Sequence, residues 1–366
     1  MEILRDVAII LFSFYFMSEI VDVLFIKSLD NIAARLKLSE SVSGATLLAF
    51  GTSAPEIATA LFALFLAEAH PATGVGTIVG SAIFQILVVI GFACIANRSK
   101  LSWKPILRDS AFYAFSVILL LVFVQDNKLT LLEGAILVGC YILYLTFLNL
   151  WMRYIDNESK AAENESYIKE EYAIEDVLPR RGLLRKTIDI VTAPLRLLIR
   201  IIPDPAKSSQ WTYPVFILCL GFIALASYWM VMAAERLALQ IGIPTEIIAL
   251  TILAGGTSMP EIISSYIVAK QGRGDMAIAN AIGSNIFDIL MSLGLPVLIY
   301  TLMHGDISGI GSANITSSVI LLFASLLLVL LAFVLTRFHA TRLLGYTLIV
   351  IYVVYVWGAY AGWLEV

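Results

Sequence analysis

The sequence predicts an all-α polytopic membrane protein with about ten transmembrane helices. Hydrophobic residues make up 60% of the 366 residues and charged residues only 14%. A soluble domain averages about 45–50% apolar and about 25% charged residues. Apolar runs long enough to cross a bilayer as helices recur along the chain, whereas a barrel strand needs only about 10 residues. The backbone amides of a segment in lipid must find partners within that segment, which also favours helices.

The spans are expected at regular intervals on both sides of one long polar segment. The first apolar run, Val7 to Ile26, exceeds the apolar core of a signal peptide and lacks a small-residue cleavage site, so we interpret it as a span. The predicted spans are 6–28, 40–67, 73–97, 106–125, 129–153, 212–239, 244–269, 275–302, 314–336 and 342–363.

The polar segment predicts three domains: a first five-helix unit at 1–153, a loop at 154–210 and a second five-helix unit at 211–366. Eight acidic and four basic residues lie between Asp156 and Arg181, which is typical of a solvated loop. The stretch from Leu183 to Ile202 mixes four basic residues with Leu and Ile: Arg185, Lys186, Arg196 and Arg200. That pattern suits an amphipathic helix at the membrane interface, bent at Pro194, with a plain solvated linker as the alternative.

The Lys and Arg residues predict the orientation of the spans. Of the 24 basic residues, all except Arg5, Lys128 and Arg236 fall in the loops that follow the odd-numbered spans or at the span ends next to these loops. Basic residues concentrate in cytoplasmic loops. Both termini are therefore expected on the outer side, and the 154–210 loop in the cytosol.

An internal repeat relates the two predicted five-helix units. GATLLAFGTSAPEI at 44–57 matches ALTILAGGTSMPEI at 249–262 in nine of fourteen positions, and GSAIFQ at 80–85 matches GSNIFD at 283–288. The second copy begins five spans after the first. Five is an odd number, so the copies are expected to have opposite orientation, as in transporters whose binding site lies near the bilayer midplane between inverted repeats.

Each copy contains a helix break followed by a carboxylate at membrane depth. Pro55 and Pro260 lack an N–H group and leave the carbonyl oxygens of Gly51 and Gly256 without a helical donor. The glutamate that follows each proline is costly to bury, and such a residue is by default a candidate functional site.

Hydroxyl, carbonyl and carboxylate oxygens are the ligands of a hard cation such as Ca²⁺. No basic residue occupies the middle of a predicted span, so we expect the partner of Glu56 and Glu261 to be a cation from solution. Asp288 adds a third carboxylate, four residues after Ser284 and on the same helix face.

The two pairs of blocks resemble the repeats of the calcium/cation antiporter superfamily, which contains the sodium/calcium exchangers. The resemblance covers nearly the whole chain. Further segments resemble the potassium-dependent sodium/calcium exchanger branch, among them GTIVGSA at 76–82, Arg108-Asp109 and Gly274-Asp275.

The resemblance implies a metal site at the matching positions of this sequence. Glu56 and Glu261 would be the central Ca²⁺ ligands, with help from Thr52 and Thr257. The flanking Na⁺ sites would be formed by Ser53, Ser81, Ser258 and Ser284 with the backbone oxygens of Ala49 and Ala254. Asp288 stands where an acidic residue accompanies potassium dependence. Gln85 departs from the usual Asn and is more like the proton-coupled members, which leaves sodium and proton as alternative counter-ions.

The resemblance implies a secondary-active antiporter in a plasma or inner membrane that exchanges Ca²⁺ for Na⁺, with or without K⁺. The alternatives are a Ca²⁺/H⁺ antiporter and a passive cation channel. An enzyme is not expected, since a serine protease needs a base such as His and no His lies in a predicted span. We expect no cofactor, no nucleic-acid partner, and lipid and cations as the partners.

Overall fold

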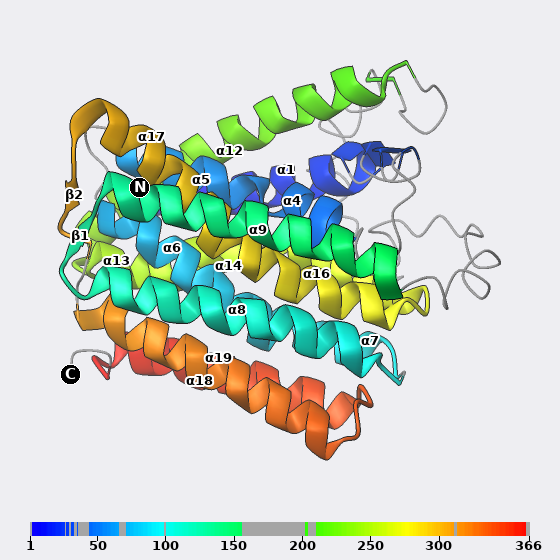
Figure 1. The fold of residues 1–366 in the computed structure, drawn as a ribbon. Helices are drawn as coiled ribbons and strands as arrows, with labels where there is room; N and C mark the ends of the chain where they lie inside the picture. Colours follow the sequence, from blue (N-terminus) through cyan, green and yellow to red (C-terminus); the bar gives the residue numbers. More distant parts are fainter. Residues whose placement is uncertain are drawn as a thin grey trace.

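The computed structural model describes residues 2–25, 27–28, 31–32, 35, 44–65, 71–98, 100–155, 202–203, 210–310 and 313–363. Nearly all of these residues are helical, and the long helices lie side by side in one bundle (Figure 1). Helix α1 begins and helix α19 ends at the same end of this bundle. The predicted interfacial helix at 183–202 lies almost entirely outside the described residues.

Seven helices among the described residues are long and apolar enough to cross a membrane. They are Pro71–Ala96, Trp103–Val124, Leu131–Trp151, Thr212–Ile241, Gly274–His304, Ile315–Leu335 and Arg342–Tyr360. Each coincides with a predicted span. Predicted span 6–28 coincides with the continuous helical segment formed by Glu2–Ile20 and Val21–Phe25. The described parts of predicted spans 40–67 and 244–269 coincide with shorter helical segments, which turns or changes of helical pitch separate.

The first half of the chain, up to residue 155, contains helices, π-helical segments (η) and one short strand. They are α1 (Glu2–Ile20), η1 (Val21–Phe25), η2 (Gly44–Leu48), α4 (Ala49–Thr52), α5 (Ala54–Phe65), α6 (Pro71–Phe84), η3 (Gln85–Val89), α7 (Ile90–Ala96), α8 (Trp103–Val124), β1 (Lys128–Leu129) and α9 (Leu131–Ile155).

The second half has a similar order of helices, but its strand lies one helix earlier than the strand of the first half. It contains α12 (Thr212–Ile241), α13 (Thr245–Ile248), η5 (Ala249–Leu253), α14 (Ala254–Thr257), α15 (Met259–Lys270), α16 (Gly274–Phe287), η6 (Asp288–Leu293), α17 (Gly294–His304), β2 (Ile307–Ser308), α18 (Ala313–Leu335) and α19 (Arg342–Tyr360). Strands β1 and β2 pair antiparallel, with Lys128 opposite Ser308, and join the two halves.

Local sequence explains where several helices begin and end. Thr130 and Glu133 form a capping box before α9, in which the Thr130 N–H donates to the Glu133 carboxylate at 2.7 Å. The hydroxyl of Thr341 accepts from the Leu344 N–H at the start of α19. Gly242 follows α12 with φ +70°, a left-handed conformation that favours glycine.

The repeated helices are broken at equivalent serines, as the prolines predict. Ser53 separates α4 from α5 with φ −85° and ψ 8°, and Ser258 separates α14 from α15 with φ −85° and ψ 10°. Pro55 and Pro260 follow in the first turn of the next helix, where a missing N–H costs least. The two breaks therefore have nearly the same backbone geometry.

Glycines of the second repeated block let each half cross the other closely. A Cβ atom on Gly80 would overlap the carbonyl oxygen of Leu250 in η5, and one on Gly283 would lie 2.7 Å from the Ala45 Cα in η2. Helix α6 of the first half thus crosses η5 of the second, and α16 of the second half crosses η2 of the first. These crossings place the repeated segments at the centre of the bundle.

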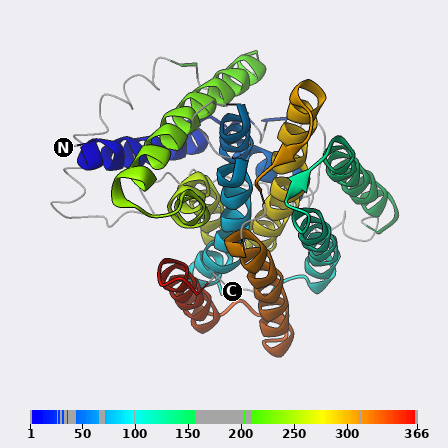
Figure 2. The same cartoon turned by 90° about the vertical axis from the view of Figure 1, so that its left-hand side faces the viewer.

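Helices α1 and α12 lie side by side on one flank of the bundle, whereas α18 and α19 lie on another (Figure 2). The α1–α12 pair has its own apolar cluster, which includes Ile10, Met17 and Met230. Asp6 of α1 accepts hydrogen bonds from Arg236 and Gln240 of α12 at 3.2 Å and 2.9 Å. A polar clamp and an apolar interface therefore hold these two helices together.

Candidate functional site

Both glutamates of the repeated motif lie in the first turn of a half-helix at the centre of the bundle. Glu56 is the third residue of α5 and Glu261 the third residue of α15, and neither side chain is exposed to solvent (0% each). The N-terminal turn of a helix carries partial positive charge and free N–H groups, which favour a carboxylate there. The break at the preceding serine therefore creates the environment that both glutamates occupy.

Each glutamate is held by the serine of the other repeat. The Ser258 hydroxyl donates to Glu56 Oε1 at 3.0 Å, and the Ser53 hydroxyl donates to Glu261 Oε1 at 3.3 Å. All four side chains are buried. The two bonds are reciprocal, so the site depends on both halves of the chain.

Gln85 and Asp288 occupy equivalent positions and bind each other across the repeats. They are the first residues of η3 and η6, the π-helical segments that continue α6 and α16, and such segments are frequent at functional sites. Gln85 Nε2 donates to Asp288 Oδ2 at 2.9 Å and lies 3.5 Å from Ser258 Oγ. This amide therefore connects the third carboxylate to the serine that holds Glu56.

Hydroxyl groups from both repeats gather around one backbone oxygen of the second repeat. Ser81 Oγ lies 3.0 Å from Thr257 Oγ1, and the two hydroxyls donate to the carbonyl oxygen of Ala254 at 3.3 Å and 3.2 Å. The predicted site residues Ser81, Thr257 and Ala254 are thus brought together.

The equivalent residues around the first break are arranged differently. Thr52 donates to the Leu48 carbonyl of its own helix at 3.0 Å, and the carbonyl oxygen of Ala49 accepts from the Ser53 N–H at 2.9 Å. The Ser284 hydroxyl, the counterpart of Ser81, has no hydrogen-bond partner within the described part of the chain. The two halves of the site therefore share residue types but not every contact.

Several oxygens of this cluster are buried without a compensating group. Glu56 Oε2, Glu261 Oε2 and Gln85 Oε1 have no hydrogen-bond partner among the described residues. No basic side chain of the described ranges forms an ion pair with Glu56, Glu261 or Asp288. Asp288 is connected to Glu56 through Gln85 and Ser258, so these two carboxylates belong to one buried network. Since a buried unpaired charge is costly, the cluster requires protons or bound cations.

Glu56, Glu261 and Asp288 do not all surround one point. Within the described residues, no group of three or more Asp, Glu, His or Cys side chains is spaced to hold one metal ion. The available donors are instead a mixture of carboxylate, hydroxyl, amide and backbone oxygens. An ion at this site would take most of its ligands from neutral oxygens.

Three polar residues near the cluster escaped the sequence-based prediction. Ser292 donates to Asp288 Oδ1 at 3.1 Å. Asn285 and the Tyr113 hydroxyl are buried, and their side-chain polar atoms lack partners among the described residues. The second repeated block has Asn285 where the first has Ala82. This polar replacement in an otherwise similar block could have marked Asn285 as a candidate site residue. Tyr113 lies outside both blocks, so no motif marks it.

The acidic residues of the flanking helices have other partners. Glu19 accepts from the Tyr15 hydroxyl at 2.8 Å, and Glu235 accepts from the Thr73 hydroxyl at 2.6 Å. Arg236 pairs with Asp6 rather than with its neighbour Glu235. The side chain of Asp22 lies outside the described residues.

A helical bundle of membrane-spanning length, with three buried carboxylates and no basic partner for them among the described residues, is typical of a cation-transporting membrane protein. Comparison with known proteins agrees with this class. The model of the family described as "Sodium/calcium exchanger protein" matches residues 6–150 and 211–361. The chain therefore belongs to the sodium/calcium exchanger family and is an integral, multi-pass membrane protein.

Curated relatives and solved structures extend this comparison. Sodium/potassium/calcium exchanger 2 of Homo sapiens is 28% identical over 94% of this chain and 76% of its own length. Sodium/potassium/calcium exchanger 4 of Mus musculus is 27% identical over 94% of this chain and 79% of its own length. A structure of the sodium-calcium exchanger NCX_Mj, soaked with Na⁺ and Sr²⁺, has a TM-score of 0.59 at 23% identity and covers 96% of this chain and 97% of its own. This last likeness concerns the fold.

Proposed function

We propose that the chain is a secondary-active antiporter that exchanges Ca²⁺ for Na⁺ by alternating access. The observation that carries this proposal is the reciprocal pair of bonds in which Ser258 holds Glu56 and Ser53 holds Glu261. These bonds leave one oxygen of each glutamate without a partner among the described residues. The names of the family and of the curated relatives support the same function.

The buried charges explain why transport would be coupled exchange. Closing the site without a bound ion would leave three carboxylates in a low-dielectric interior, where they repel one another and lack counter-charges. Loading with one Ca²⁺ or with several Na⁺ compensates this charge. The protein would therefore change sides only when loaded.

The ligand assignment follows the resemblance and the observed contacts. Glu56 and Glu261 would bind Ca²⁺ with Thr52 and Thr257. The Na⁺ sites would be formed by Ser53, Ser81, Ser258 and Ser284 with the backbone oxygens of Ala49 and Ala254. Gln85 and Asp288 would form the bridge between the two halves. Asn285 is added to this assignment because its amide atoms are buried without partners among the described residues.

The proposed architecture has ten spans in two inverted repeats of five, with both termini outside. The equivalent breaks at Ser53 and Ser258 and the common end at which α1 begins and α19 ends support it. In this arrangement residues 1–153 and 211–366 form the two repeats, and 154–210 forms a cytosolic loop. We place the protein in the plasma or inner membrane.

Potassium is proposed as a further transported ion. The two curated relatives are named sodium/potassium/calcium exchangers, and Asp288 supplies a carboxylate where the first repeat has the neutral Gln85. A Ca²⁺/H⁺ antiporter is the second candidate. The observation that favours it is Gln85 itself, which replaces the usual Asn of the sodium-coupled members.

The test is Ca²⁺ uptake into proteoliposomes that contain the purified full-length protein. Three gradients are imposed separately: Na⁺, Na⁺ with K⁺, and H⁺. We expect saturable uptake that requires Na⁺ on the opposite side and increases with K⁺. Uptake driven by H⁺ alone would favour the second candidate. Non-saturating flux without a cation on the opposite side would indicate a channel and would refute exchange.

A further inference from the structure

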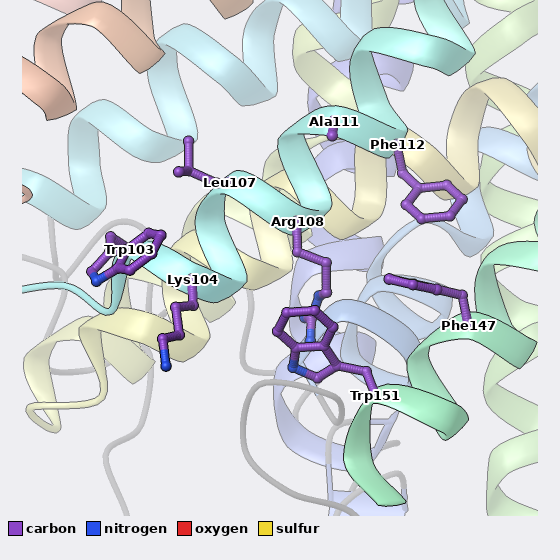
Figure 3. A pocket seen from close by; sticks show the side chains of 8 residues that line it. All are labelled: Trp103, Lys104, Leu107, Arg108, Ala111, Phe112, Phe147 and Trp151. Atoms are coloured by element: carbon purple, nitrogen blue, oxygen red, sulfur yellow. The ribbon is translucent and has the colours of Figure 1, made fainter. Parts of the chain in front are cut away.

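An apolar groove runs between α8 and α9 (Figure 3), and none of the residues that line it belongs to the carboxylate cluster. Its volume is about 520 Å³, within the range of about 300–1,000 Å³ that is typical of small-molecule sites. Trp103, Leu107 and Phe112 line it from α8, and Phe147 and Trp151 line it from α9. The groove opens toward the surroundings of the helices, where the membrane is expected.

Aromatic contacts give this groove a defined wall. The ring centroids of Phe112 and Phe147 lie 5.2 Å apart, and those of Phe147 and Trp151 lie 5.9 Å apart. The Arg108 guanidinium stacks over Trp151 at 5.3 Å. Arg108 also donates two hydrogen bonds to Asp109, at 2.8 Å and 2.9 Å. The aromatic side chains of the wall therefore contact one another in a row. The charge of the buried Arg108 is compensated by Asp109.

One end of the groove is positively charged. Lys104 lines this end and is exposed, and the connector before α8 carries Arg98 and Lys100, which are also exposed. The acidic residue bonded to this connector is Asp275, whose carboxylate accepts two hydrogen bonds from Ser102 at 2.7 Å and 2.6 Å. Among the described residues at this end, cationic side chains therefore outnumber anionic ones.

The chemistry of the groove defines its occupant. A long apolar slot on a membrane-facing surface suits a hydrocarbon chain, and tryptophans at its charged end are typical of the headgroup level. Basic side chains between transmembrane helices attract anionic headgroups. A free phosphate ion would make no favourable contact with the aromatic wall, whereas an acyl chain would. We propose that this groove binds one anionic phospholipid, with an acyl chain between α8 and α9 and its phosphate at Lys104.

Such a lipid would contact a helix that also reaches the centre of the bundle. The opposite face of α8 carries Ser110 and Tyr113, which are buried, and α8 packs against α16. Helix α16 bears Ser284 and leads into Asp288. A lipid bound in the groove would therefore stabilise the position of α8 against the second repeated block.

The experiment measures quenching of tryptophan fluorescence by lipids with brominated acyl chains. The full-length protein is reconstituted into phosphatidylcholine vesicles in which the brominated lipid is either phosphatidylglycerol or phosphatidylcholine, at the same fraction. We expect stronger quenching by the anionic lipid. Trp103→Phe and Trp151→Phe should each reduce this excess, which assigns it to the groove.

Two variants separate the contribution of the Lys104 charge to lipid binding from the contribution of the apolar groove. Lys104→Gln should weaken the apparent affinity for phosphatidylglycerol by about fivefold, the factor expected for one basic residue at an anionic surface. Ala111→Leu narrows the groove and should remove the excess while Lys104 remains. The matched controls are Lys128→Gln, at the opposite end of the bundle, and Ala135→Leu, on an exposed part of α9.

The proposal is overturned if the anionic lipid gives no excess quenching in the wild type. It is also overturned if the excess survives unchanged in both Lys104→Gln and Ala111→Leu, or in both tryptophan variants. Each of these results is independent of whether Ca²⁺ is exchanged for Na⁺.

Discussion

The two repeats have the same backbone at the site but differ in one charge. The breaks at Ser53 and Ser258 have almost identical dihedral angles, and each serine holds the glutamate of the other repeat. At the next equivalent pair, however, the first repeat has the neutral Gln85 and the second has Asp288. The shared residues thus define the geometry of the cluster, and the differing pair makes it electrostatically asymmetric.

The largest predicted effect is on Ca²⁺ uptake, and it tests the glutamates that the two repeats share. Glu56→Gln and Glu261→Gln should each reduce Ca²⁺ uptake by about 100-fold or more, because each removes a charge that we propose as a direct ligand. That factor corresponds to about 2.7 kcal/mol. Uptake under a Na⁺ gradient measures it, with Asp306→Asn on the exposed surface as the control. Wild-type uptake in either glutamine variant would refute the assigned roles.

The next effect tests the crossings that bring the repeats together. Gly80→Ala and Gly283→Ala should destabilise the protein to similar extents, by about 1–3 kcal/mol each, because the added methyl group meets backbone atoms. Thermal unfolding in detergent measures this. Gly139→Ala and Gly221→Ala are matched controls, since nothing lies within 4 Å of a Cβ there. A control as destabilised as the crossing variants would contradict the steric explanation.

A smaller effect tests the asymmetric pair. Asp288→Asn should reduce the stimulation of Ca²⁺ uptake by K⁺ about tenfold, or about 1.4 kcal/mol, because it removes the charge that distinguishes the second repeat. Gln85→Asn keeps an amide at the equivalent position and should leave K⁺ stimulation intact. Uptake measured over a range of K⁺ concentrations separates the two. Equal losses of K⁺ stimulation in both variants would mean that the hydrogen bond between Gln85 and Asp288, rather than the charge of Asp288, determines the response to K⁺.

The smallest effect concerns the clamp between α1 and α12, which has no repeated counterpart in the described contacts. Arg236→Gln should cost about 1 kcal/mol of stability, because the arginine side chain is about one-third exposed (34%) and the buried Asp6 carboxylate keeps its hydrogen bond from Arg5. Gln240 would still hold Asp6. A fluorescence-based melting curve detects the change, with Lys128→Gln as the control. A large loss of stability would give this clamp a structural role comparable to that of the crossings.

Much of this fold was predictable from the sequence because lipid imposes a simple pattern on it. Transmembrane helices require long apolar runs, and the repeated motif by itself indicated both breaks and both glutamates. The prolines identified the breaks correctly, since a missing N–H has a local consequence that follows from sequence alone. The positions of α5 and α15 at the centre of the bundle are consistent with the burial expected for Glu56 and Glu261.

The contacts of the site were less predictable, because they join residues about 200 positions apart. Nothing in the motif indicates that Ser258 holds Glu56 rather than Glu261. That choice depends on how the two halves pack against each other, and the close crossings at Gly80 and Gly283 are visible only in the structure. The lipid groove escaped prediction for the same reason, since its wall combines one face of α8 with one face of α9.

The exchange of serine partners between the halves also has an evolutionary consequence. Neither half can complete its own carboxylate environment, so in the proposed inverted arrangement an ancestral single-length chain would have needed a second copy in the opposite orientation. After duplication and fusion, a substitution at Ser53 would remove a hydrogen bond to Glu261 in the other copy. The two copies were then free to diverge mainly at positions outside these pairs, and Gln85 and Asp288 show how one such divergence gave the fused chain two unlike halves.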